Sequence, residues 1–319
     1  MRLIILVAVI IGATTGCVGT QRTVPTVAGA TEIVWQVDYS IGVTEGPVYD
    51  GAGGVWFVHA PCAPPNPCPE LRTSLLRFDI ESGETVTLLE DANTVGLAFD
   101  EQGRLLATIL GASLSRRSRG QLDEVEVLAD NWQGTPLFGP NDLVLDDRGG
   151  VYFTDLGGQL GNAVYYFDSS GDLHQVSSGI LANNGISLSP NGSTLYVAGQ
   201  ARGEIFAFDV MEDGSLQGQR VFATTPAMAP DGLTVDRHGN VYAAGLAIRP
   251  RNPNAASPEN LRPAVVVWDS DGEELLTIDP PEGHEPVNLT LVPPDGNMLY
   301  VTSREGLYRV PLRFVGAGE

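Results

Sequence analysis

A sequence pattern that occurs six times along the 319-residue chain constrains the fold more than any other feature. Most copies begin with a polar residue, often followed by a small one, and continue with an alternating apolar segment, an Asp- or Gly-containing turn, and a second segment rich in apolar and aromatic residues. Alternation on both sides of such a turn is typical of a β-hairpin. The starts of the copies are 50, 46, 43, 47 and 57 residues apart. The copies are EGPVYDGAGGVWFVH (45–59), VGLAFDEQGRLLATI (95–109), NDLVLDDRGGVYFTD (141–155), NGISLSPNGSTLYVAG (184–199), DGLTVDRHGNVYAAG (231–245) and NLTLVPPDGNMLYVTS (288–303).

The repeat predicts an all-β fold, a six-bladed β-propeller with four-stranded blades. Most copies are followed by a third strand that ends in an aromatic residue and Asp, and helical periodicity is absent. The last repeat reaches only its third strand (306–314) before the chain ends. We expect the N-terminal run EIVWQVDYS (32–40) to supply the missing outer strand, which closes the ring and covers a sheet edge.

The N-terminus resembles an export signal. Residues 1–16 have one early Arg and an apolar run that is too short to cross a bilayer. Cys17 follows small residues, as in a bacterial lipobox, so we expect Cys17 to be lipidated. The alternative is an ordinary cleavable signal with an incidental Cys. The expected organisation is a signal peptide (1–16), a lipid-anchored tether (17–30) and the propeller (31–319), exported and held on the outer side of a bacterial membrane.

Two further cysteines, Cys62 and Cys68, lie close together in PCAPPNPCPE. An exported protein meets an oxidising compartment, so we expect a disulfide between them. The alternative is a metal site, but the CxxC spacing of zinc sites is absent and no His lies between the two cysteines.

Composition excludes several classes of function. The formal net charge is −21, and a surface this acidic repels phosphate backbones, so we expect no nucleic-acid partner. All 18 cationic residues are Arg, which excludes Schiff-base, PLP and P-loop chemistry that needs a lysine amine. We expect a monomer that acts on a small molecule.

The first residues of the six copies predict a metal site. The innermost strand of each blade lines the central channel, so these six "ring positions" converge on one axis. A ring of carboxylate and amide oxygens suits Ca²⁺, which takes six to eight oxygen ligands, although Mn²⁺ or Zn²⁺ stays possible. The alternative is that these residues are simply good turn formers at strand entries. The ring positions are Glu45, Val95, Asn141, Asn184, Asp231 and Asn288.

The repeats EGPVYD, PNDLVLDDRGGVYFTD, NNGISLSPNGSTLYVAG and PDGLTVDRHGNVYAAG resemble those of the senescence-marker-protein/gluconolactonase family. The similarity covers roughly 45–310. This resemblance implies a divalent ion, usually Ca²⁺, in the channel mouth and hydrolysis of lactones or related esters. By motif match it places metal ligands at Glu45, Asn184 and Asp231. Asn141 matches a family position that is a ligand or a substrate contact, and Asn288 is carried over as a substrate contact in the final repeat.

Strand direction places further candidates on the channel mouth. Second strands end on the same face as the ring, so His59 and Asp155 should lie there, as should His284 in a loop that enters an inner strand. A general base near a metal is most often His or a carboxylate, so Asp231, His59 and His284 compete for that role, and the family resemblance favours Asp231. We expect substrate contacts from Asp155 and from two loop aromatics, Trp132 and Phe138. For the aromatics, ordinary loop packing is the alternative.

Two classes of function follow. In the first, the protein is a metal-dependent lactone or ester hydrolase in which the cation polarises the carbonyl group. In the second, it is a surface-tethered binding propeller whose Ca²⁺ is structural. A third interpretation, a metal-free propeller that resembles strictosidine synthase, does not account for Glu45, Asn184 and Asp231.

Overall fold

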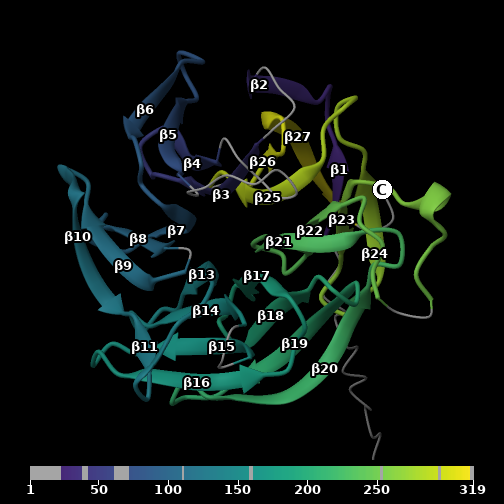
Figure 1. Cartoon of the computed structure of the whole chain (residues 1–319). Coiled ribbons are helices and arrows are strands. Elements are labelled where there is room, and N and C mark those ends of the chain that lie inside the picture. Colours follow the sequence, from purple (N-terminus) through teal and green to yellow (C-terminus); the bar gives the residue numbers. More distant parts are fainter. Residues whose placement is uncertain are drawn as a thin grey trace, which may run out of the picture.

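The computed structural model shows six β-sheets arranged around a central axis, with the innermost strand of each sheet facing the middle of the ring (Figure 1). It describes residues 23–37, 42–60, 72–109, 111–157, 161–251, 254–293 and 296–316. The expected six-bladed, all-β propeller is therefore confirmed. The single helical element described is a short 3₁₀ turn, η2 (Pro258–Asn260).

Each of the first five blades is an antiparallel meander whose four strands follow one another in sequence. Blades one to three comprise β3 (Val43–Tyr49), β4 (Gly54–Ala60), β5 (Ser74–Asp79) and β6 (Thr85–Leu89); β7 (Thr94–Phe99), β8 (Leu105–Ile109), β9 (Ser113–Ser118) and β10 (Gln121–Ala129); β13 (Pro140–Leu145), β14 (Val151–Leu156), β15 (Asn162–Phe167) and β16 (Leu173–Ser178). Blades four and five comprise β17 (Asn183–Leu188), β18 (Thr194–Gly199), β19 (Glu204–Val210) and β20 (Leu216–Thr224); β21 (Ala229–Val235), β22 (Val241–Leu246), β23 (Ala264–Trp268) and β24 (Glu274–Ile278). A small hairpin, β11 (Asn131–Trp132) and β12 (Thr135–Pro136), precedes blade three.

The sixth blade joins the two ends of the described chain. It contains β25 (Pro286–Leu291), β26 (Met298–Ser303) and β27 (Gly306–Gly316), and both β1 (Thr23–Val27) and β2 (Glu32–Gln36) pair with β27. The expected closure by residues 32–40 is confirmed over 32–36. The expected tether at 17–30 is wrong over 23–27, because those residues pair with 312–316 as a second closing segment. Their alternation, Thr-Val-Pro-Thr-Val, suits a strand, and the length of β27 leaves an edge for them to cover.

Aspartates at the ends of inner strands build the turns on the face opposite the ring, here called the rear face. In blade one, Asp50 Oδ1 accepts hydrogen bonds from the backbone N–H groups of Ala52 (2.7 Å) and Gly54 (2.8 Å). The same pattern recurs at Asp100, Asp146 and Asp236. A side chain that satisfies two turn amides fixes the hairpin register, which is why the acidic turn recurs in the repeat.

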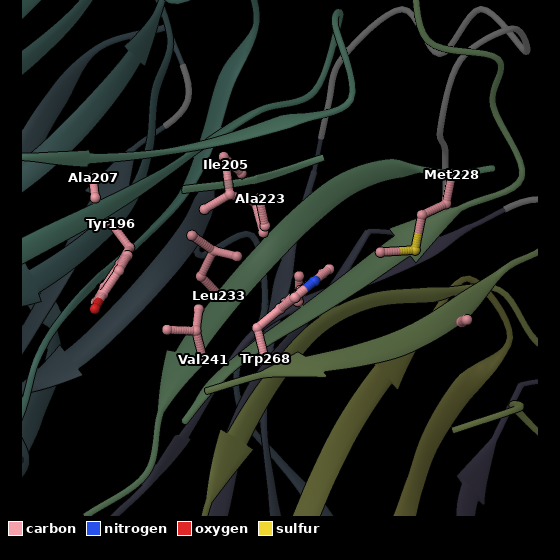
Figure 2. Packing of buried hydrophobic residues seen from close by; sticks show 11 residues of the cluster. Tyr196, Ile205, Ala207, Ala223, Met228, Leu233, Val241 and Trp268 are labelled. Carbon is pink, nitrogen blue, oxygen red and sulfur yellow. The ribbon is translucent and has the colours of Figure 1, made fainter. Parts of the chain in front are cut away.

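Apolar side chains between neighbouring blades form the core. Figure 2 shows the cluster between blades four and five, in which Tyr196 and Ile205 approach Leu233, Val241 and Trp268. Similar clusters lie between the other blades, so each blade is stabilised by burial against its neighbours and the ring of apolar contacts holds the inner strands in place.

The inner strands approach one another most closely at the ring positions. In four blades the residue after the ring position is glycine, and a Cβ atom on any of these glycines would overlap the next blade. On Gly185 it would meet the backbone of Asp231 and Leu233, for example. The four glycines are Gly46, Gly96, Gly185 and Gly232. Glycine at this point therefore brings adjacent ring positions within contact distance.

Three expectations concern residues outside the described ranges. The signal peptide at 1–16, lipidation of Cys17 and the Cys62–Cys68 disulfide all fall there and stay predictions. Within the described ranges, the chain contains no helix with the length and apolar character that crossing a membrane requires.

The close approach at the axis predicts a steric effect on stability. We expect Gly185→Ala to lower the free energy of unfolding by about 3 kcal/mol, because the new methyl group overlaps backbone atoms that cannot move aside. Gly120→Ala is the matched control, since a Cβ there meets nothing within 4 Å, and we expect a change within about 0.5 kcal/mol. Urea unfolding of both variants measures the difference, and equal midpoints would contradict the close approach.

Candidate functional site

The structure brings the polar ring positions together at one mouth of the channel. Asn141, Asn184, Asp231 and Asn288 are buried there, and Glu45 is partly buried. Each inner strand pair has a register irregularity at or beside its ring position. Such bulges turn a side chain out of the regular pleat, which here directs it toward the axis.

A hydrogen-bond network connects these side chains across blades. Asn141 Nδ2 donates to Asn184 Oδ1 (2.7 Å), and the Asn184 side chain lies close enough to Asp231 to lower the pKa of that carboxyl group. Gln200 Nε2 donates to Asp231 Oδ2 (3.1 Å). Asn288 Nδ2 donates to Glu45 Oε2 (3.4 Å), and Asn288 Oδ1 accepts the backbone N–H of Leu289. The amides thus act as donors to the carboxylates, which fixes the orientation of the acidic groups.

Asp142 is a site residue that the sequence analysis missed. Its carboxylate is buried, and Asn288 Nδ2 donates to both of its oxygens at 3.0 Å. Asp142 occupies the register that glycine occupies in blades one, two, four and five, so a carboxylate in blade three breaks the repeat at the axis. Comparing this second register position across the copies, as we compared the first, would have identified it.

Glu45, Asp142 and Asp231, here called the axial carboxylates, all have a raised pKa. Burial raises the pKa of Glu45 well above its usual range, and the charges of Asp231 and Asp142 raise it further. Burial also raises the pKa of Asp142 to about 6. The pKa of Asp231 is raised by burial and by Asp142, an effect that Arg304, Gln200 and Asn184 only partly offset. Three acidic groups confined together favour either protons or a cation at the axis.

The donor chemistry fits a hard divalent ion. Asp231 Oδ1 is buried and has no hydrogen-bond partner, so it is an orphaned acceptor within the network. The available donors are carboxylate and amide oxygens, which Ca²⁺ prefers. In the part of the chain that the structure covers, no group of three or more His, Cys, Asp or Glu side chains is spaced to hold an ion, and the expected ligand set accordingly includes the amides of Asn141 and Asn184.

The two candidate histidines pack against aromatic rings. The His59 ring lies edge-on to Trp35, 5.5 Å between centroids, and burial lowers the pKa of His59. His284 is only 4% exposed, and its ring lies edge-on to Tyr308 at 6.1 Å. Trp35 and Tyr308 belong to paired strands of blade six, so both imidazoles are held within blades one and six. Asp231 is the one candidate base that lies in the axial network.

Two expected substrate contacts have structural roles instead. Asp155 is fully buried, and its carboxylate accepts the backbone N–H groups of Phe138, Gly139 and Gly157. Trp132 packs against the apolar cluster of blades two and three, with its ring 6.2 Å from that of Tyr165. The prediction of direct contact is therefore wrong for Asp155, and Trp132 follows the loop-packing alternative. Phe138 is exposed on the mouth, as expected for an apolar contact.

The axial carboxylates predict a pH dependence of stability in calcium-free protein. The folded state binds the Asp142 proton more tightly than the unfolded chain does, so this group's contribution is greatest below pH about 4 and is lost as pH rises through about 6. We expect Asp142→Asn to flatten this part of the pH profile and to raise the free energy of unfolding at pH 7 by on the order of 2 kcal/mol. Unfolding midpoints from pH 4 to 8 in chelator measure this, and a variant less stable than wild type at pH 7 would contradict it.

Comparison with known proteins agrees with this geometry. The model of the SMP-30/gluconolactonase/LRE-like region matches residues 43–305. The chain is 24% identical over 212 residues to a gluconolactonase of Zymomonas mobilis, covering 60% of this chain and 55% of that protein. It is 24% identical over 236 residues to the pentonolactonase XacC of Haloferax volcanii, covering 73% and 74%. The chain thus spans about half the length of the first relative and about three quarters of the second.

Solved structures agree as well. A gluconolactonase of Xanthomonas campestris has a TM-score of 0.69 and 26% identity, over 91% of this chain and 95% of that one. Regucalcin of Agrobacterium tumefaciens, described as a calcium-binding protein, has a TM-score of 0.69 and 19% identity, over 88% and 93%, which shows the shared fold. Because the family model covers most of the chain and the repeats carry its motifs, the protein belongs to the SMP-30/gluconolactonase/LRE-like family.

Proposed function

We propose that the protein is a divalent-cation-dependent hydrolase that opens a lactone or a related ester, with Ca²⁺ as the cation. The observation that carries this proposal is the set of axial carboxylates with the orphaned Asp231 Oδ1, which together need a positive charge at the channel mouth. The names of the relatives, gluconolactonase and pentonolactonase, support the substrate class.

Four ring positions are suited to hold the cation. Glu45 and Asp231 supply negative charge, and Asn141 and Asn184 supply amide oxygens. When bound, Ca²⁺ polarises the substrate carbonyl and stabilises the negative charge that develops on its oxygen. Asp142, tied to Asn288, adds a third carboxyl group beside the proposed cation site from the side of blade three.

Asp231 is the residue best placed to activate water. Gln200 holds its Oδ2 atom, which leaves Oδ1 to accept a proton as the water oxygen attacks the carbonyl carbon. The carbon–oxygen bond of the lactone ring then breaks, and the leaving oxygen takes the proton that Asp231 accepted from the water, so the product is a hydroxy acid and Asp231 returns to its starting state.

The alternative is a binding propeller with a structural cation. In that case the same residues stabilise the channel, the exposed mouth is a recognition surface, and water activation by Asp231 plays no part. Turnover distinguishes the two functions, because both predict that the cation stabilises the fold.

The metal-dependent proposal predicts paired effects on stability and activity. We expect Ca²⁺ added to chelator-treated protein to raise the Tm by several degrees and to restore lactone hydrolysis. Glu45→Gln should weaken Ca²⁺ binding at least about 10-fold, and Asp231→Asn should lower kcat at least about 100-fold. Calorimetric Ca²⁺ titration and a pH-indicator assay on a panel of sugar and alkyl lactones measure both.

Matched controls separate specific from general effects. Asp213→Asn changes an exposed carboxyl group in a rear-face turn and should alter neither Ca²⁺ affinity nor turnover. His284→Gln should lower the Tm, because the ring packs on Tyr308, while the pH–rate profile keeps its shape. Calcium binding without turnover of any lactone would favour the binding propeller, and a pH–rate profile changed by His284→Gln would reassign the base.

A further inference from the structure

Two large apolar side chains occupy the same exposed position in neighbouring repeats. Phe138 and Leu181 each lie three residues before a ring position, Asn141 and Asn184 respectively. Phe138 is 59% exposed and Leu181 is 50% exposed. Since the two asparagines are hydrogen-bonded to each other, the two apolar residues flank the same part of the channel mouth.

The repeat itself does not require this exposure. In blades two and five the equivalent positions are Ala92 and Met228, which are 2% and 3% exposed and belong to interblade clusters. Blades three and four therefore present to solvent a position that blades two and five use for the core.

Exposed apolar side chains fall into three groups by position. Ten large ones are exposed among the described residues; six lie on the outermost strands and one, Met211, lies in a rear-face turn. The other three, Phe138, Leu181 and Ile248, lie in loops on the channel mouth and are here called the apolar rim. Single exposed apolar residues are common, but three around one site mark a contact surface.

Hydrogen bonds between loops connect part of the apolar rim to the axial network. The backbone N–H of Ala201 donates to Leu181 O (3.4 Å), and that of Arg251, in the loop of Ile248, donates to Ala201 O (2.6 Å). Gln200, the residue before Ala201, donates a hydrogen bond to Asp231 Oδ2. The loops of blades four and five are thus positioned relative to the proposed reaction centre.

Partly or fully buried polar side chains hold the backbone of the rim. Asp155 accepts the N–H groups of Phe138 and Gly139, each at 3.0 Å. Asn162 Oδ1 accepts the N–H of Ala182 (3.0 Å), which has a φ of 50°, a left-handed conformation that costs a non-glycine residue free energy. A rim that is fixed before binding loses little conformational entropy when a ligand covers it.

At blades five and six the channel mouth is lined by charged side chains. A cavity of about 730 Å³ there is lined by Arg262, Arg304, Glu282, Glu285 and Glu305, among others. Arg304 also acts on Asp231 through its charge. The mouth therefore has an apolar side at blades three to five and a charged side that begins between blades five and six.

We propose that the substrate is a lactone with a hydrocarbon substituent of several carbons, which lies on the apolar rim while the lactone ring occupies the axial site. This inference rests on the proposed hydrolase function and extends it to a substrate class. Polyhydroxylated sugar lactones offer no apolar group to cover Phe138, Leu181 and Ile248, whereas an alkyl chain gains free energy from that burial.

The test is a series of γ-lactones whose side chain grows from methyl to octyl, assayed with the full-length, calcium-loaded protein. We expect kcat/KM to rise about threefold per added methylene over the first several carbons and then to level off. Phe138→Ser and Leu181→Ser should each reduce the octyl-to-methyl ratio of kcat/KM several-fold. Val127→Ser, at a 55% exposed site on the outermost strand β10, is the matched control and should keep the wild-type ratio.

A binding measurement separates this inference from the proposed function. Matching γ-lactams resist hydrolysis, and their Kd by calorimetry should fall with chain length in wild type and fall less steeply in Phe138→Ser. If the methyl lactone or gluconolactone is hydrolysed but neither kcat/KM nor lactam affinity depends on chain length, the inference is wrong and the hydrolase function stands. If no lactone is hydrolysed, the proposed function fails, whatever the lactams bind. A third outcome is that the wild type binds phosphatidylcholine vesicles, that Phe138→Ser abolishes this binding, and that neither kcat/KM nor lactam affinity depends on chain length. The rim would then be a membrane contact, and the inference would be wrong.

Discussion

The mutual repulsion of Glu45, Asp142 and Asp231 is the interaction on which the rest of the structure depends. These carboxyl groups come from three different blades and are desolvated at one point, which raises the pKa of each. Local sequence cannot hold them there, so the free energy comes from apolar burial between the blades. The propeller therefore uses its core to hold an arrangement that is unfavourable by itself and that a bound cation relieves. The residues at the channel mouth therefore form the candidate functional site and also lie at the centre of the fold.

Amide side chains complete this arrangement without adding charge. Asn288 and Gln200 each donate to an axial carboxylate across blade boundaries, and Asn184 lowers the pKa of Asp231. A fourth or fifth carboxylate at these positions would increase the repulsion, and an apolar side chain would leave acceptors unsatisfied. The mixture of acids and amides at the ring positions thus suits the proposed site for one divalent ion, and under that proposal the loops outside it determine which substrate fits.

The fold could be predicted well from the sequence because the six copies of the repeat each show where the strands of a blade begin and end. The same register located four buried polar ring positions and Glu45, since each begins an inner strand. Asp142 was missed because only the first position of each copy was compared, although glycine in four of the other copies makes an Asp there unusual.

Asp155 and Trp132 were placed on the correct face, but the directions of their side chains depend on contacts distant in sequence. Asp155 binds backbone amides of the loop 137–139, and Trp132 meets Tyr165. The tether was extended too far because the partner strand of β1 lies about 290 residues away in the sequence, although the alternation of residues 23–27 suits a strand.

The contact between Asn288 and Glu45 joins the last blade to the first across 243 residues of chain. The pairing of β1 and β2 with β27 completes the same junction from the outside of the ring. A growing polypeptide that has emerged as far as blade five already contains Glu45 and Asp231, yet it lacks the partner that closes the circle. The arrangement of side chains at the axis therefore forms only after blade six has been synthesised, so a chain that stops before blade six lacks the contact between Asn288 and Glu45. Because blade six closes the ring, formation of the site depends on a late step of folding.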